Sequence, residues 1–170
     1  LNYGSSGIGS SHHLTMEAMK AALGIDVTHV PFKGSSQSVP ALIGGQVDVA
    51  FSALPSLSGF VKGGKVKLLA TNGAKRSIHE PDVPAIAEMV PGFDFAVVVG
   101  MLAAAGTPQA AIDRMAAEME KVAKMPDTIQ VLSNAGVDAV GAGPAEYGKT
   151  ILDENERLAK AIKAAGIKQD

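Results

Sequence analysis

The order of strand and helix signals over residues 1–97 is the feature that most restricts the fold of this chain. Short runs of apolar and β-branched residues alternate there with stretches of helical periodicity. Strands are expected at 2–3, 26–30, 47–51 and 66–71, with helices over 11–23, from Ser35 or Ser36 to 43, and from Pro55 onward. Strands separated by helices form βαβ units, which assemble a parallel sheet through right-handed crossovers. The sequence therefore predicts an α/β fold.

Residues 98–170 differ in character, because helices dominate there and little sheet accompanies them. The apolar run 95–102 predicts a strand, and 137–140 predicts a short one. Helices are expected from Pro108, over 127–134 and from Pro144 to Gly166. Their apolar faces need a sheet to cover. We therefore expect a nearly complete doubly wound lobe over 1–97. Residues 98–170 would be a crossover strand and the C-terminal helices of a second, incomplete lobe. Because the chain enters a strand directly at Leu1, we expect the missing sheet to be encoded upstream.

Composition excludes several classes of function. The net charge of -2 and pI of about 6.1 provide no basic surface for phosphate backbones, so no nucleic-acid partner is expected. The longest apolar run, 95–105, is shorter than the about 20 residues that span a bilayer, so no membrane insertion is expected. The chain has no cysteine, which excludes thiolate metal sites and cysteine nucleophiles. The adjacent His12 and His13 point about 100° apart on a helix and cannot share one metal. We therefore expect no metal and no other cofactor.

A loop of glycine and serine, residues 4–11, joins the first expected strand to the first expected helix. Such a loop exposes backbone N–H groups, and the start of a helix adds a partial positive charge. The segment can therefore bind a carboxylate or phosphate without a cationic side chain, although a tight turn that binds nothing would have the same pattern. The candidate ligand contacts here are Ser5, Ser6, Gly7, Gly9, Ser10 and Ser11, mostly through N–H groups.

Two later loops occupy the same position in the strand–helix alternation. Ser35 follows the second expected strand, and Ser52 follows the third. Ligands of open α/β sheets lie at the carboxyl ends of the strands, so both serines are further candidates. Either loop can equally be an ordinary strand-to-helix turn.

These segments contain none of the motifs that would indicate an enzyme. No Gly-Lys-Ser/Thr follows the loop, and the spacing of Gly4, Gly7 and Gly9 differs from both the dinucleotide fingerprint and the nucleophile elbow. No carboxylate pair and no Ser/His/Asp set has a spacing that demands catalysis. We therefore name no catalytic residue. An acyl or phosphoryl transferase that uses the loop as an oxyanion site stays open as a weaker alternative.

Several sequence blocks, taken together, resemble one known family. They are Tyr-Gly-Ser-Ser-Gly-Ile-Gly-Ser-Ser-His-His-Leu from Tyr3, His-Val-Pro-Phe-Lys-Gly-Ser from His29, Leu-Ile-Gly-Gly-Gln-Val-Asp-Val-Ala-Phe from Leu42 and Ala-Gly-Thr-Pro from Ala105. This order is similar to that of the Bug/TctC family, the extracytoplasmic binding proteins of tripartite tricarboxylate transporters. Many members have Asp-Asn where this chain has Ser52-Ala53. An acidic partner for a ligand's ammonium group is therefore missing there.

The resemblance implies a type II periplasmic binding protein fold, in which two lobes close on a ligand. Each lobe would hold a carboxylate through one strand-to-helix loop, and residues 4–11 match the loop of the second lobe. The implied function is a periplasmic solute-binding receptor for a small carboxylic acid, with the permease subunits of a membrane transporter as partners. A sensor that binds the same ligand but docks on a signalling protein is the alternative.

Overall fold

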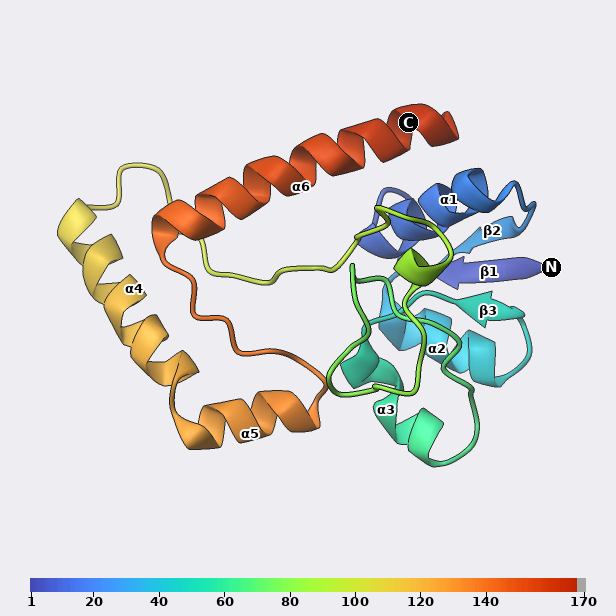
Figure 1. Cartoon of the computed structure of the whole chain (residues 1–170), viewed down its shortest axis with the longest axis horizontal. Helices are drawn as coiled ribbons and strands as arrows, with labels where there is room; N and C mark the ends of the chain where they lie inside the picture. Colours follow the sequence, from blue (N-terminus) through green and yellow to red (C-terminus); the bar gives the residue numbers. More distant parts are fainter. Residues whose placement is uncertain (168–170) are drawn as a thin grey trace. The chain divides into compact units, whose positions relative to one another are not determined.

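The computed structural model describes residues 1–167 (Figure 1). The chain divides into two compact units. The first comprises Leu1–Ala96 together with the end of the chain from Arg157, and the second comprises Val97–Glu156. None of the helices in the described part of the chain has the length and apolar character that crossing a bilayer requires.

A three-stranded parallel sheet forms the centre of the first unit. Its strands are β1 (Asn2–Ser5), β2 (Thr28–Pro31) and β3 (Val49–Ala50), in the order β2-β1-β3. In the register of the sheet, Gly4 lies opposite Val30 on one side and Ala50 on the other. This is the parallel sheet that the alternating pattern predicts. Because β1 is the central strand, the loop that follows it lies between the loops that follow its neighbours.

Helices cover both faces of this sheet. Helix α1 (Ser11–Leu23) connects β1 to β2, and α2 (Ser35–Ile43) connects β2 to β3, on opposite sides of the strands (Figure 1). On the α1 side, the fully buried Tyr3 packs with Met16 and Val27. Gly4 points the other way, where a Cβ atom would lie 3.3 Å from Phe32. The first crossover runs outward from β1 to β2, and the second runs back past β1 to β3. Right-handed crossovers that run in opposite directions across a sheet place their helices on opposite faces, which is the doubly wound arrangement.

The predicted strand at 66–71 is wrong. After α3 (Leu54–Lys62) the chain is irregular up to the short 3₁₀ helix η1 (Ile86–Glu88). Thr71 alone in this stretch bridges another segment, at Ala85, with hydrogen bonds from Thr71 N–H to Pro84 and from Ile86 N–H to Thr71. A ladder cannot extend because the partner segment turns into η1 immediately after the bridge. The sequence run is apolar enough for a strand but finds no continuous neighbour.

The second unit contains helices α4 (Gln109–Ala123) and α5 (Pro126–Asn134) and the first part of α6 (Pro144–Ala165). The strands predicted at 95–102 and 137–140 are wrong, because neither segment forms a β-ladder with the described residues. The Phe95 N–H alone of these two segments is bonded to the segment before η1, at the Asn72 carbonyl. Without a neighbouring strand, large apolar side chains stay exposed: Val99 is 91% and Leu102 74% exposed. A strand forms only where another backbone satisfies its N–H and C=O groups, and sequence periodicity does not supply that backbone.

The end of α6 that belongs to the first unit is held to the segment after η1. The Arg157 guanidinium lies 3.4 Å from the Asp94 carboxylate and 6.0 Å from the centre of the Phe95 ring. Phe95 in turn contacts Phe93, whose ring centre lies 4.7 Å away. The ion pair and the cation–π contact of Arg157 thus help to fix the distal part of α6.

Candidate functional site

The loop between β1 and α1, residues 6–10, has a shape that only glycine permits at two positions. Gly7 and Gly9 have φ angles of 132° and 74°. At Gly7 a Cβ atom would also lie 3.2 Å from the carbonyl oxygen of Phe32. L-residues with side chains rarely adopt such positive φ angles. The two glycines let the chain reverse tightly before α1 begins.

Four backbone N–H groups of this segment have no acceptor within the described residues. They belong to Ser6, Ile8, Ser11 and His12. Those of Ser11 and His12 lie in the first turn of α1, where helical geometry leaves N–H groups unpaired and the helix dipole is positive. Side chains at 6, 11 and 12 are half-buried, and Ile8 is exposed. The loop therefore offers neutral donors to an anion.

The remaining donors of the predicted set are used within the loop. The N–H of Gly7 donates to Ser5 Oγ at 3.1 Å, that of Gly9 to His13 Nδ1 at 3.1 Å, and that of Ser10 to the Gly7 carbonyl at 3.2 Å. Ser10 is also the N-cap of α1, because its hydroxyl accepts from the His13 N–H at 3.2 Å. Ser5 is fully buried. These residues shape the loop, while Ser6 and Ser11 keep free N–H groups.

Sequence reasoning missed Ile8 and His12 as donors. It singled out glycine and serine by residue type, whereas a free N–H group depends on position in the loop. The signal for His12 was available, because the first helical residues never have intrahelical acceptors. For Ile8 no sequence signal existed, since its freedom follows from the path that Gly7 and Gly9 impose.

The loop after β2 is hydrogen-bonded directly to the Gly/Ser loop. Phe32 N–H donates to the Ser5 carbonyl at 3.2 Å, and Gly34 N–H donates to the Ser6 carbonyl at 3.1 Å. Ser35 is half-buried and is the first residue of α2. Ser52 follows β3 at the same edge of the sheet, and its hydroxyl is buried with no partner among the described residues. The structure thus joins the first two loops, and the parallel register brings the third to their side.

Three histidine rings are hydrogen-bonded to residues of the Gly/Ser loop. His29 Nε2 lies 2.6 Å from Ser5 Oγ, and His12 Nδ1 lies 2.8 Å from Ser6 Oγ. The rings of His13 and His29 stack with centres 4.1 Å apart, and the Tyr3 ring stacks on His29 at 4.8 Å. Both His12 and His29 thus make hydrogen bonds within the protein. Within the described residues, no group of three or more His, Asp or Glu side chains could hold a metal ion.

Burial controls the charge of these rings. It lowers the pKa of His12 and of His13, and it lowers the pKa of His29 to about 4, with the nearby His13 adding to the effect. Tyr3 O–H donates to Glu17 at 2.6 Å, and burial followed by this contact raises the pKa of Tyr3. Burial alone would raise the pKa of Glu17, but the hydrogen bonds from Lys20 and Tyr3 outweigh it and lower that pKa. At neutral pH the three imidazoles are therefore uncharged.

Acid is expected to destabilise the first unit over a window set by these histidines. An unfolded histidine binds a proton near pH 6.5, whereas folded His29 does so near pH 4. Between these values the unfolded state holds more protons, so stability is complete above about pH 6.5 and falls as the pH is lowered toward about 4. Thermal melts followed by circular dichroism should show this decline, and His29→Gln should reduce it. A melting temperature that stays constant from about pH 7 to about pH 4.5 would contradict the assignment.

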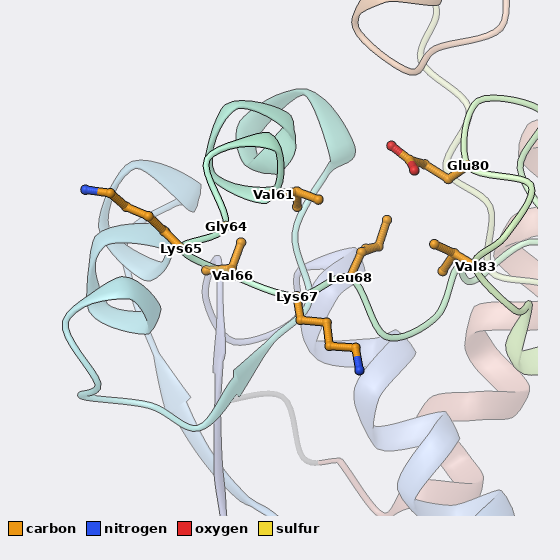
Figure 2. Close-up of a pocket in the computed structure, with 8 residues that line it drawn as sticks. All are labelled: Val61, Gly64, Lys65, Val66, Lys67, Leu68, Glu80 and Val83. Carbon is orange, nitrogen blue, oxygen red and sulfur yellow. The ribbon is translucent and has the colours of Figure 1, made fainter.

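The first unit also has a concave depression, which lies away from the Gly/Ser loop in the sequence. It is an open, shallow depression of about 630 Å³ beside the segment after α3 (Figure 2). Its lining combines aliphatic and charged side chains and includes Leu68, Glu80 and Val83. None of the predicted ligand contacts lines it, so the depression is separate from the Gly/Ser loop.

Solved structures identify the class of fold. The chain is similar to R. palustris Rpa4515 with adipate, at 30% identity and a TM-score of 0.92 over 98% of this chain and 56% of that one. It is likewise similar to a periplasmic transporter, at 32% identity and a TM-score of 0.89. That match covers 99% of this chain and 57% of the other. The fold is thus that of a periplasmic binding protein, present in part, which confirms the predicted fold class.

The family follows from the sequence as a whole. The model of the TctC family, the tripartite tricarboxylate transporter family receptor, matches residues 1–167, and this chain belongs to that family. A UPF0065 protein from the tcbD–tcbE intergenic region of Pseudomonas sp. strain P51 is 32% identical over 95% of this chain and 49% of the relative. The protein BugT of Bordetella pertussis is 27% identical over 95% and 50%. The chain therefore spans about half the length of the curated relatives it matches, and the predicted resemblance is confirmed.

Proposed function

We propose that this protein is a periplasmic solute-binding receptor that captures a small carboxylic acid at the Gly/Ser loop and delivers it to a tripartite membrane transporter. The observation that carries the proposal is the set of four unpaired N–H groups at Ser6, Ile8, Ser11 and His12. Oriented N–H groups at a helix N-terminus are a site for a carboxylate. Similarity to a protein solved with adipate and, at 25% identity and a TM-score of 0.80, to MatC from Rhodopseudomonas palustris with bound malate supports the same ligand class.

The chemistry of the loop favours capture and release over turnover. The donors are neutral, so a bound carboxylate would be held by hydrogen bonds and would leave without breaking a strong ion pair. The serine hydroxyls at positions 5 and 10 already have partners, because Ser5 Oγ bonds to His29 on β2 and Ser10 Oγ donates to the Gly7 carbonyl. Ser5 is moreover shielded from solvent and lacks the access that a nucleophile needs. We therefore propose a receptor and no catalytic residue.

An amide NMR titration tests the proposal. Adipate and malate are added to the ¹⁵N-labelled protein, because this measurement detects even millimolar binding. The expected result is saturable shifts concentrated at Ser6, Ile8, Ser11 and His12. Adipamide, which has the length of adipate but no charge, is the control and should cause little change. Shifts elsewhere with none in the loop, or equal shifts with adipamide, would contradict a carboxylate site there.

A further inference from the structure

Three imidazoles bind three different residues of the Gly/Ser loop. His13 and His12, both on α1, contact Gly9 and Ser6, and His29 on β2 contacts Ser5. The contacts lie at 3.1, 2.8 and 2.6 Å respectively. Three residues that shape the loop are therefore hydrogen-bonded to imidazole side chains, whose charge depends on pH.

The bond at Gly9 determines the protonation state of His13. A backbone N–H group can only donate, so His13 Nδ1 must accept and must be free of a proton. The neutral ring then carries its proton on Nε2. Protonation of Nδ1 would set two donors against each other at 3.1 Å, and the Gly9 end of the loop would have to move.

The charged groups around the rings act in both directions, because Glu17 favours the protonation of His13 and His29 whereas Lys20 opposes it. His29 stacks on both Tyr3 and His13, and the His13 and His29 planes differ by 12°. Glu17, the carboxylate that acts on both rings, already accepts from Tyr3 at 2.6 Å and from the Lys20 ammonium at 2.8 Å. Two imidazolium rings with centres 4.1 Å apart would therefore share one carboxylate with a lysine.

We propose that His13 and His29, in their neutral form, are positioning residues that hold the Gly/Ser loop in its anion-binding shape, so that carboxylate affinity falls when they become protonated. This inference rests on the proposed function for its ligand. Burial lowers the pKa of both rings, which keeps the loop ordered at neutral pH. The receptor would retain its ligand near neutrality and lose it in acid.

Substitution of His13 by asparagine separates this role from a merely structural one. In His13→Asn the side-chain oxygen occupies the place of Nδ1 and accepts from Gly9, but it does not titrate. Adipate affinity is measured from about pH 8 to about pH 4.5 in both proteins, with circular dichroism confirming that each stays folded. Ionisation of adipate affects its binding to both proteins equally. The ratio of the two dissociation constants therefore reports only the contribution of the protein's own titrating groups. The wild-type constant should rise about tenfold more than that of His13→Asn over this range. Parallel pH dependence would overturn the proposal.

A matched control and a ligand-free measurement complete the test. His79→Asn makes the same change outside the loop and should keep the wild-type pH dependence. Without ligand, the Gly9 amide shift should follow the His13 imidazole ¹⁵N shifts with one common midpoint. A Gly9 amide shift that does not change as His13 titrates would overturn the positioning role. If Gly9 follows His13 but no carboxylate binds near pH 8, the positioning role stands and the carboxylate function fails.

Discussion

Gly9→Val is expected to weaken carboxylate binding by at least tenfold, because valine strongly disfavours the φ of 74° that this position requires. A β-branched residue at positive φ costs about 1–3 kcal/mol, and the loop can avoid that cost by changing its path. Such a change is expected to turn the N–H groups of Ile8 and Ser11 away from a bound carboxylate. Titration calorimetry or the NMR titration with adipate measures the loss.

Gly24→Val is the matched control for this substitution. Gly24 ends α1 with a φ of 63°, and neither Gly9 nor Gly24 has an atom within 4 Å of an added Cβ. Both substitutions therefore introduce backbone strain without a steric clash. Gly24→Val should lower thermal stability yet leave affinity unchanged, since it lies at the opposite end of α1 from the loop. Equal affinity in Gly9→Val and wild type would refute the assignment of the loop as the binding site.

Tyr3→Ala is expected to remove most of the stability of the first unit. The ring is 0% exposed and packs between Met16 and Val27 while stacking on His29. Truncation of a buried aromatic ring to alanine costs about 3–5 kcal/mol, mainly through the cavity it leaves. That cost is a large part of the about 5–15 kcal/mol that stabilises a typical domain. Urea unfolding followed by far-UV circular dichroism gives the change in the free energy of unfolding.

Tyr3→Phe divides that effect into its two parts. It keeps the ring in the core and removes only the hydrogen bond to Glu17. The expected loss is about 1–2 kcal/mol, because one part-buried hydrogen bond to a carboxylate disappears while the packing stays. A loss in Tyr3→Ala no larger than that in Tyr3→Phe would show that the ring does not fill the core as described.

Local sequence patterns correctly predicted most of the helices and strands of the first unit. Ser10 and Gly24 delimit α1 by capping, and the turn residues after each strand placed the loops at one edge of the sheet. These features depend on neighbours a few residues away, so a sequence pattern records them well. The predicted strands at 66–71, 95–102 and 137–140 fail for the opposite reason, because pairing depends on a backbone that is distant in sequence.

The candidate site shows the same division at the level of single atoms. Residue types alone predicted a Gly/Ser loop between the first strand and the first helix, and the proposal that it binds an anion rests on the same signals, since glycine frees the backbone and a helix start leaves donors unpaired. Which N–H groups stay free was decided by tertiary structure. The Ser5 side chain is bonded to His29, and the Gly9 N–H is bonded to His13. The N–H groups of Ile8 and His12, in contrast, have no acceptor among the described residues. Local propensity is encoded residue by residue, whereas the use of each hydrogen bond depends on which side chains the fold brings within reach.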